Sequence, residues 1–262
     1  GHGRRVVVTQ VPPIAGLDQR AETLGRQIEA ELGERRFHII GHSTGGLDAR
    51  VLLSRPGWRK RAISLICVGT PHLGTSLADA GLTHLSPLLR VLSLLGINHG
   101  GFRDISRRKS RRFSRQFPDT GEYPCYSFAG EPDDDEVCHP LRPLHSLMER
   151  WEGANDGLVG VESALGYGVP LFPRPIDHLR QMNWMTSSHR QANLRQRVLQ
   201  LYGDLHQLIL ESERDETPST LAGVHDAVSL AVPIEFRAIE PTLASAGSEP
   251  VPAIDAPPAS AR

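Results

Sequence analysis

The pentapeptide Gly41-His42-Ser43-Thr44-Gly45 is the feature that most restricts how this chain can fold. An apolar run at residues 37–40 leads directly into it, and a helical pattern at residues 45–53 follows directly after it. A serine between a strand and a helix adopts a strained backbone conformation, and glycines beside it let the strand and the helix approach closely. The segment therefore predicts a sharp turn that exposes the Ser43 hydroxyl at the end of a strand.

The rest of the chain repeats this alternation of strand and helix. Strands alternating with helices at this spacing predict an α/β fold, with a mostly parallel central sheet flanked by helices and right-handed crossovers. The apolar runs predict strands at residues 4–10, 37–40, 62–68, 123–129 and 169–172. The helical spacing predicts helices at residues 18–32, 45–53, 103–115 and 188–211.

The 262 residues are enough for one sizeable core, and we predict a single domain over residues 1–212. Within it, residues 77–100 are rich in leucine and lack the polar face of a surface helix, so we expect residues 77–122 to form an inserted lid or cap, with an ordinary buried helix pair as the alternative. Residues 213–262 are rich in Pro, Ala, Ser and Glu, a composition that predicts a disordered tail.

Charge and hydropathy exclude several classes of partner. The formal net charge of −1 gives no overall field toward nucleic acid or anionic lipid, although local patches stay possible, and the basic stretch at residues 103–115 is interpreted as a solvated helix face rather than a nucleic-acid contact. No run of about 18 apolar residues occurs, so no transmembrane helix is predicted. The compartment is left undetermined by the sequence.

The three cysteines have no metal-ligand spacing, so neither a disulfide framework nor a zinc site is predicted. Cys67 fits a small buried apolar side chain, whereas pairing of Cys125 with Cys138 stays open. No cofactor and no metal ion are expected.

A serine hydroxyl becomes a strong nucleophile when an imidazole takes its proton and a carboxylate orients that imidazole. Asp156 lies on a tight turn in the segment NDGLV, and His178 follows 22 residues later, after the predicted strand at 169–172. We therefore predict Ser43 as nucleophile, Asp156 as the acid and His178 as the base. The amide of Thr44, at the start of the following helix, is the first expected oxyanion donor.

Other carboxylates and imidazoles fit these roles less well. The run Asp133–Asp135 is typical of a solvated loop, and Asp177 adjoins His178 too closely to face the same imidazole edge. His42 and His72 fit structural roles beside the nucleophile turn and the segment GTPHLGT. The remaining candidates have no strand end to project them, namely His139, His145 and His189.

Three segments resemble the bacterial triacylglycerol lipases of the α/β-hydrolase superfamily. They are FHIIGHSTGGLDAR at 37–50, ISLICVGTPHLGTSLAD at 63–79 and NDGLVGVESALG at 155–166, with a weaker fourth, DHLRQMNW, at 177–184. The resemblance extends over about 200 residues, and it implies an α/β-hydrolase fold and the roles given above for Ser43, Asp156 and His178. It also implies an acyl-enzyme route for ester hydrolysis and a lid over an acyl pocket.

The chain departs from those lipases in three ways. They carry an earlier strand ending in a His-Gly element that supplies a second oxyanion amide, whereas Gly1-His2-Gly3 precedes a different strand. The resemblance therefore implies either an N-terminally incomplete chain or another segment that supplies this amide. Calcium-binding members have acceptor side chains where this chain has Arg180 and Trp184, so no calcium is expected there. Members with a disulfide have a cysteine near the position of Val161.

The leading hypothesis is a serine ester hydrolase, a lipase or carboxylesterase, acting on lipid or small acyl esters. Contact with a lipid interface through the lid belongs to this hypothesis. An acyltransferase using the same triad and a non-catalytic or truncated hydrolase-like protein are the alternatives, since the sequence does not separate them.

Overall fold

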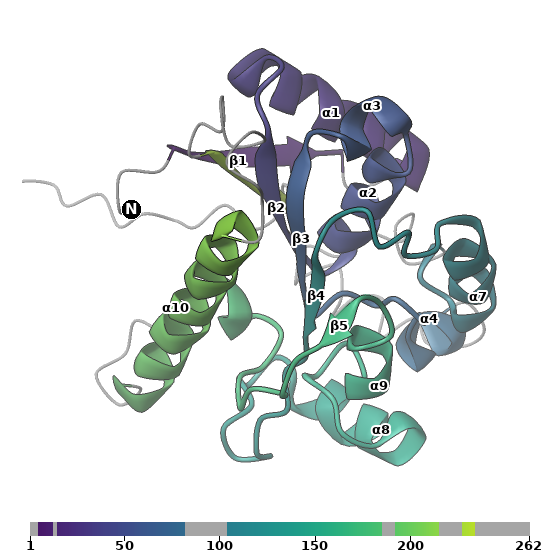
Figure 1. The fold of residues 1–262 in the computed structure, drawn as a ribbon. Helices are drawn as coiled ribbons and strands as arrows, with labels where there is room; N and C mark the ends of the chain where they lie inside the picture. Colours follow the sequence, from purple (N-terminus) through teal and green to yellow (C-terminus); the bar gives the residue numbers. More distant parts are fainter. Residues whose placement is uncertain (1–4, 13–14, 82–103, 185–191, 215–226, 234–262) are drawn as a thin grey trace, which may run out of the picture.

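The computed structural model describes residues 5–12, 15–81, 104–184, 192–214 and 227–233 (Figure 1). Its strands are β1 (Arg5–Val11), β2 (Phe37–His42), β3 (Ala62–Val68), β4 (Cys125–Phe128), β5 (Val169–Pro170) and β6 (Ala227–Pro233). Its α-helices are α1 (Leu17–Leu32), α2 (Thr44–Leu53), α3 (Pro56–Arg59), α4 (Ser76–Gly81), α7 (Arg107–Gln116), α8 (Arg142–Glu152), α9 (Val161–Ala164) and α10 (Ala192–Arg214), with a 3-10 turn, η1 (Arg180–Met182).

The strands form one sheet in the order β1-β6-β2-β3-β4-β5, and every strand pair is parallel. The predicted mostly parallel sheet flanked by helices is thereby confirmed. Two strands are shorter than the sequence predicts. Strand β4 covers Cys125–Phe128 rather than residues 123–129, and β5 covers Val169–Pro170 rather than residues 169–172. The short β5 lies at the edge of the sheet, where it has one hydrogen-bonding neighbour.

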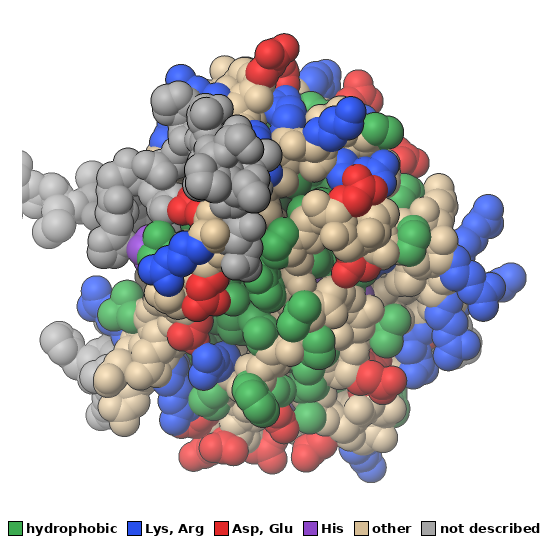
Figure 2. All heavy atoms as spheres, in the orientation of Figure 1, with side chains coloured by type: hydrophobic (Ala, Val, Ile, Leu, Met, Phe, Trp, Pro, Cys, Tyr) green, Lys and Arg blue, Asp and Glu red, His purple; other side chains and the backbone are tan. Residues whose placement is uncertain are grey.

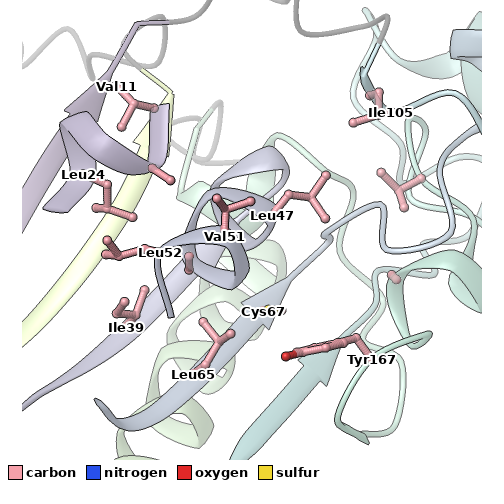
Figure 3. Close-up of a cluster of buried hydrophobic side chains, with 14 of the residues drawn as sticks. Val11, Leu24, Ile39, Leu47, Val51, Leu52, Leu65, Cys67, Ile105 and Tyr167 are labelled. Carbon is pink, nitrogen blue, oxygen red and sulfur yellow. The ribbon is translucent and has the colours of Figure 1, made fainter. Parts of the chain in front are cut away.

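Successive residues of the central strands point to opposite faces of the sheet, and each face has its own apolar layer. On one face, Ile39 and Leu65 pack with helices α1 and α2, as Figure 3 shows for Leu24, Leu47 and Leu52. On the other face, the layer beneath α10 contains Ile40, Ile66, Val68, Phe128, Val198, Leu201, Leu205 and Ile209. Burying one such aliphatic side chain contributes about 1.5–3 kcal/mol, so these two layers hold the helices on the sheet.

Strand β6 comes from the segment that the sequence analysis assigns to a disordered tail. Residues Ala227–Pro233 insert between β1 and β2, where Val228 is in register with both Val6 and His38. The expectation of an unpacked tail does not hold for these seven residues. Their sequence, AVSLAVP, alternates aliphatic residues with a period of two, a strand pattern that the average composition of residues 213–262 conceals.

Only part of the predicted lid at 77–122 is described. Residues 82–103, which contain most of its leucines, lie outside the described residues, whereas α4 and α7 lie on either side of them. Within the described residues, none of the helices combines the length and apolarity that crossing a bilayer requires.

The tight contact between Gly41 of β2 and Gly46 of α2 gives a test of the fold. A Cβ atom added to Gly41 would lie 2.6 Å from the backbone of Gly46, which cannot move without shifting α2. We expect Gly41→Ala to lower the free energy of unfolding by about 2–3 kcal/mol in urea denaturation, the cost of overpacking a tight core. Gly16→Ala is the matched control, because nothing lies within 4 Å of its Cβ position. Equal stability of the two variants would contradict the tight contact.

Candidate active site

Ser43 lies at the turn between the end of β2 and the first residue of α2. Its φ angle is 52°, and Ser43 and Asn183 are the two residues other than glycine with positive φ in the described part of the chain. The amide of Ser43 donates to the carbonyl of Val68 at 2.9 Å, so the neighbouring strand β3 helps hold the turn. Strain of this kind persists where the surrounding structure imposes it, and here it leaves the Ser43 side chain partly exposed.

Asp156 and His178 come from two separate loops and meet in the interior. The Nδ1 atom of His178 lies 2.7 Å from Oδ2 of Asp156, and both side chains are almost completely buried. The backbone adds a second link, since the His178 amide donates to the Asp156 carbonyl at 2.9 Å. The sequence predicted this pair, and the structure brings its two members together.

The pKa of the Asp156 carboxyl results from opposing effects. Burial raises this pKa, but the charge and hydrogen bond of His178 and the amides of Val159 and Leu158 lower it, and the net pKa is below its ordinary value. The two amides donate to Oδ1 at 2.8 and 3.0 Å. Asp156 is therefore held as a carboxylate that favours a proton on His178 Nδ1.

Gln181 is a further contact of this pair that the sequence analysis missed. Its Nε2 donates to Asp156 Oδ2 at 3.0 Å, from the 3-10 turn η1 that begins two residues after His178. The side chain is buried, so this bond fixes the carboxylate on the side away from its amide donors. Its position three residues after the predicted base, within DHLRQMNW, was the available signal.

His178 also lies beside the turn that carries Ser43. Its ring centroid is 4.6 Å from that of His42, the residue before Ser43, and His42 Nε2 lies 3.1 Å from the His178 carbonyl oxygen. Among the described residues, the Ser43 hydroxyl and the His178 ring do not share a hydrogen bond. The structure thus joins Asp156 to His178 directly and places Ser43 next to the residue that contacts His178.

Thr44 begins α2, and the first amides of a helix have no partner within it. A buried arginine holds this end of the helix: Arg20 of α1 donates to the Thr44 hydroxyl at 2.9 Å. The same guanidinium makes two bonds of 2.8 Å to Asp48, one turn further along α2. The Thr44 amide and the positive end of the α2 dipole are consequently fixed at the Ser43 turn.

Asp177 faces away from the His178 ring and organises its loop. Its Oδ1 accepts the amides of Leu179 and Arg180, at 3.1 and 3.0 Å, and its Oδ2 accepts the amide of Cys138 at 3.1 Å. Arg180 stands where the calcium-binding lipases have a calcium ligand. It is buried here and donates to Asp177 Oδ2 at 2.7 Å and to the Glu136 carbonyl. Asp177 and Arg180 therefore tie the His178 loop to the loop after β4.

The remaining aspartates and histidines considered for the acid and base lie away from the Asp156–His178 pair or outside the described residues. Asp133–Asp135 are exposed, and His139 is exposed as well. His72 is buried between Arg50 Nη1, at 3.0 Å, and Ser127 Oγ, at 3.3 Å, and its burial lowers its pKa. His189 and the Gly1-His2-Gly3 element lie outside the described residues.

One group of side chains within the described ranges could offer ligands to a metal ion. Asp134, His145 and Glu149 each present an atom within 4.8 Å of the others, but both carboxylates are exposed, and Asp134 already pairs with His145 at 3.0 Å. The three cysteines, Cys67, Cys125 and Cys138, are buried free thiols, so the structure does not contain a bond between Cys125 and Cys138.

The sequence is similar to that of one named protein, a yeast lipase. The chain is 27% identical over 195 residues to triacylglycerol lipase 2 of Saccharomyces cerevisiae, a match that covers 70% of this chain and 59% of that lipase. The chain thus spans about three-fifths of the length of this curated relative. No family model matches the sequence.

Solved structures decide the fold. The mature form of the Bacillus licheniformis lipase BlEst2 matches with a TM-score of 0.57 and 18% identity, over 67% of this chain and 85% of that one. A metagenomic carboxyl esterase matches with a TM-score of 0.62 and 21% identity, over 80% of this chain and 66% of that one. The chain has the α/β-hydrolase fold. In this fold, strand β2 ends at the turn that carries Ser43.

His42 makes the stability of the site dependent on pH. Burial and the neighbouring His178 lower the pKa of His42 to about 3, from an ordinary value of 6.5. Between these values, the unfolded chain binds a proton that the folded chain does not, so stability falls as the pH falls through this window. We expect this one group to contribute a slope of up to about 1.4 kcal/mol per pH unit to the free energy of unfolding.

The test compares the wild-type protein with His42→Gln, which cannot titrate, by urea denaturation at several pH values across this window. The variant should show the shallower dependence of stability on pH. Identical slopes for the two proteins would contradict a neutral, buried His42.

Proposed function

We propose that the protein is a serine ester hydrolase that cleaves carboxylic esters of lipid or other acyl substrates. The bond of 2.7 Å between Asp156 and His178, beside the strained turn of Ser43, carries the proposal. The names of its relatives agree with it, because the yeast protein is a triacylglycerol lipase and the two structures are a lipase and a carboxyl esterase.

In the proposed reaction, Ser43 Oγ attacks the ester carbonyl carbon while His178 Nε2 takes the hydroxyl proton. Asp156 stabilises the imidazolium that results and keeps the ring in the required orientation. The amide of Thr44 and the end of the α2 dipole stabilise the oxyanion of the tetrahedral intermediate. A hydrogen bond between Ser43 and His178 is then needed, and in free enzymes such bonds often tighten only when substrate binds.

Collapse of the intermediate expels the alcohol, which receives the proton held by His178, and leaves the acyl group on Ser43. His178 then takes a proton from water, whose oxygen attacks the acyl-enzyme. When the second intermediate collapses, His178 returns that proton to Ser43 Oγ and the carboxylic acid is released. Gln181 and the amides of Leu158 and Val159 keep Asp156 in place through both steps.

The role of Ser43 can be tested with a p-nitrophenyl ester. We expect Ser43→Ala to lower kcat by about 10³-fold or more and to abolish labelling by a fluorophosphonate probe, because both reactions need the hydroxyl. Ser54→Ala is the control: Ser54 is exposed at the other end of α2, and its hydroxyl donates to the Val51 carbonyl at 2.7 Å. Hydrolysis that persists in Ser43→Ala would defeat the proposal, and a folded wild-type protein without activity or labelling would favour a non-catalytic role.

The choice of acid can be tested by removing each carboxylate charge. Asp156→Asn should lower kcat by about 10⁴-fold while the protein stays folded, since an amide holds the imidazole in the wrong tautomer. Asp177→Asn should instead reduce stability by about 1–3 kcal/mol with a much smaller change in kcat, because Asp177 bonds to Arg180 and to loop amides. Steady-state kinetics and urea denaturation distinguish the two; the reverse pattern would assign the acid to Asp177.

A further inference from the structure

Helix α7 has an unusual concentration of positive charge. Its sequence, RRKSRRFSRQ, contains six basic residues and no acidic one. Ser110 and Phe113 form its buried side, and all six basic residues are exposed. Figure 2 shows Lys and Arg side chains gathered on the side of the molecule where α7 lies in Figure 1.

Two of these six charges have acidic partners, and four do not. Arg107 pairs with Asp79 and Lys109 pairs with Asp104, each at 2.9 Å. The other four form no ion pair with any residue in the described ranges; we call them the α7 arginine stripe, consisting of Arg108, Arg111, Arg112 and Arg115. Their spacing of three, four and seven residues places them on one face of the helix. Like charges at these spacings destabilise a helix, so folding alone does not explain the stripe.

Direct bonds fix α7 to the loop beside the nucleophile turn. The Ser114 hydroxyl donates to the His72 carbonyl at 3.1 Å, and the Thr75 amide donates to the Ile105 carbonyl at 2.9 Å. His72 and Thr75 belong to the loop that follows β3, and the last residue of β3, Val68, is paired with His42 of β2. In the same loop, Thr70 donates to the Gly41 carbonyl at 3.4 Å, two residues before Ser43. The stripe is therefore held in a constant position relative to the proposed active site.

Arginine is suited to phosphate because its planar guanidinium donates two parallel hydrogen bonds to phosphate oxygens. A straight stripe along one exposed helix can contact several phosphates of a flat surface at once. Nucleic acid offers the same phosphate oxygens, but the proposed function favours a lipid surface, because the ester substrate of that function lies in such a surface.

We propose that the α7 arginine stripe docks the protein on a lipid surface that carries phosphate-bearing anionic headgroups. This rests on the proposed function, since a lipid-ester hydrolase meets its substrate at such a surface. Each arginine near an anionic bilayer strengthens binding by about five-fold, so four of them give an expected effect of several hundred-fold. The interaction is electrostatic and weakens as salt is added.

The experiment measures co-sedimentation of the full chain with vesicles of phosphatidylcholine alone or mixed with phosphatidylglycerol. It uses Ser43→Ala protein, so that binding is measured without hydrolysis. The stripe variant changes the four arginines to glutamine, a residue with similar helix propensity. The control variant changes four other exposed arginines to glutamine and so alters the net charge equally, namely Arg35, Arg55, Arg150 and Arg195.

We expect salt-sensitive binding to the phosphatidylglycerol vesicles that falls by about 100-fold or more in the stripe variant and is largely kept in the control variant. Equal binding of the two variants, or equal binding to both vesicle types, would overturn the proposal. Tighter binding to duplex DNA than to the anionic vesicles at the same salt would overturn it as well, in favour of a nucleic-acid partner.

A separate measurement distinguishes this proposal from the proposed function. With Ser43 intact, the stripe variant should hydrolyse a soluble p-nitrophenyl ester at the wild-type rate, because the stripe does not contact Ser43, Asp156 or His178. If the wild-type protein does not hydrolyse this ester, the proposed function fails, whereas the vesicle result reports on docking alone.

Discussion

The contact between β2 and α2 at Ser43 is the constraint on which the rest of the site depends. A Cβ atom on Gly41 would meet the backbone of Gly46, and one on Gly46 would meet the side chain of Thr70, so both positions beside the positive-φ turn of Ser43 need glycine. The turn sets the direction of the Ser43 side chain and aims the first amides of α2 at the same region. The bonds of Arg20 to Thr44 and Asp48 then hold α2 to α1 from the other side.

The imidazole and its carboxylate are positioned by a different principle, a network of buried polar groups. Asp156 accepts bonds from two backbone amides and from Gln181, and Asp177 accepts three backbone amides and Arg180. Buried carboxylates need such partners, because unpaired charge is costly away from water. Asp156 therefore orients the His178 ring, whereas Asp177 holds the loop that carries His178.

Some expectations from the sequence were reliable because their signals are local. The strand-to-helix turn at Ser43 and the parallel order of the first three strands follow from apolar runs and glycines within a few residues of one another. Helix α8 was missed, although the proline in its first turn is typical of a helix start. The strand β6 was missed because its seven residues lie in a segment whose overall composition predicts disorder.

The sequence alone determined the alternation of the first three strands with helices, the sharp turn at Ser43, and the choice of Asp156 and His178 as its candidate partners. Only the tertiary structure decided that Asp156 and His178 are bonded, that Gln181 shares the carboxylate, and that β6 inserts between β1 and β2. The physical reason is distance along the chain. Hydrophobic period and turn residues act over a few positions, whereas these hydrogen bonds and strand pairings join segments that folding must first bring together.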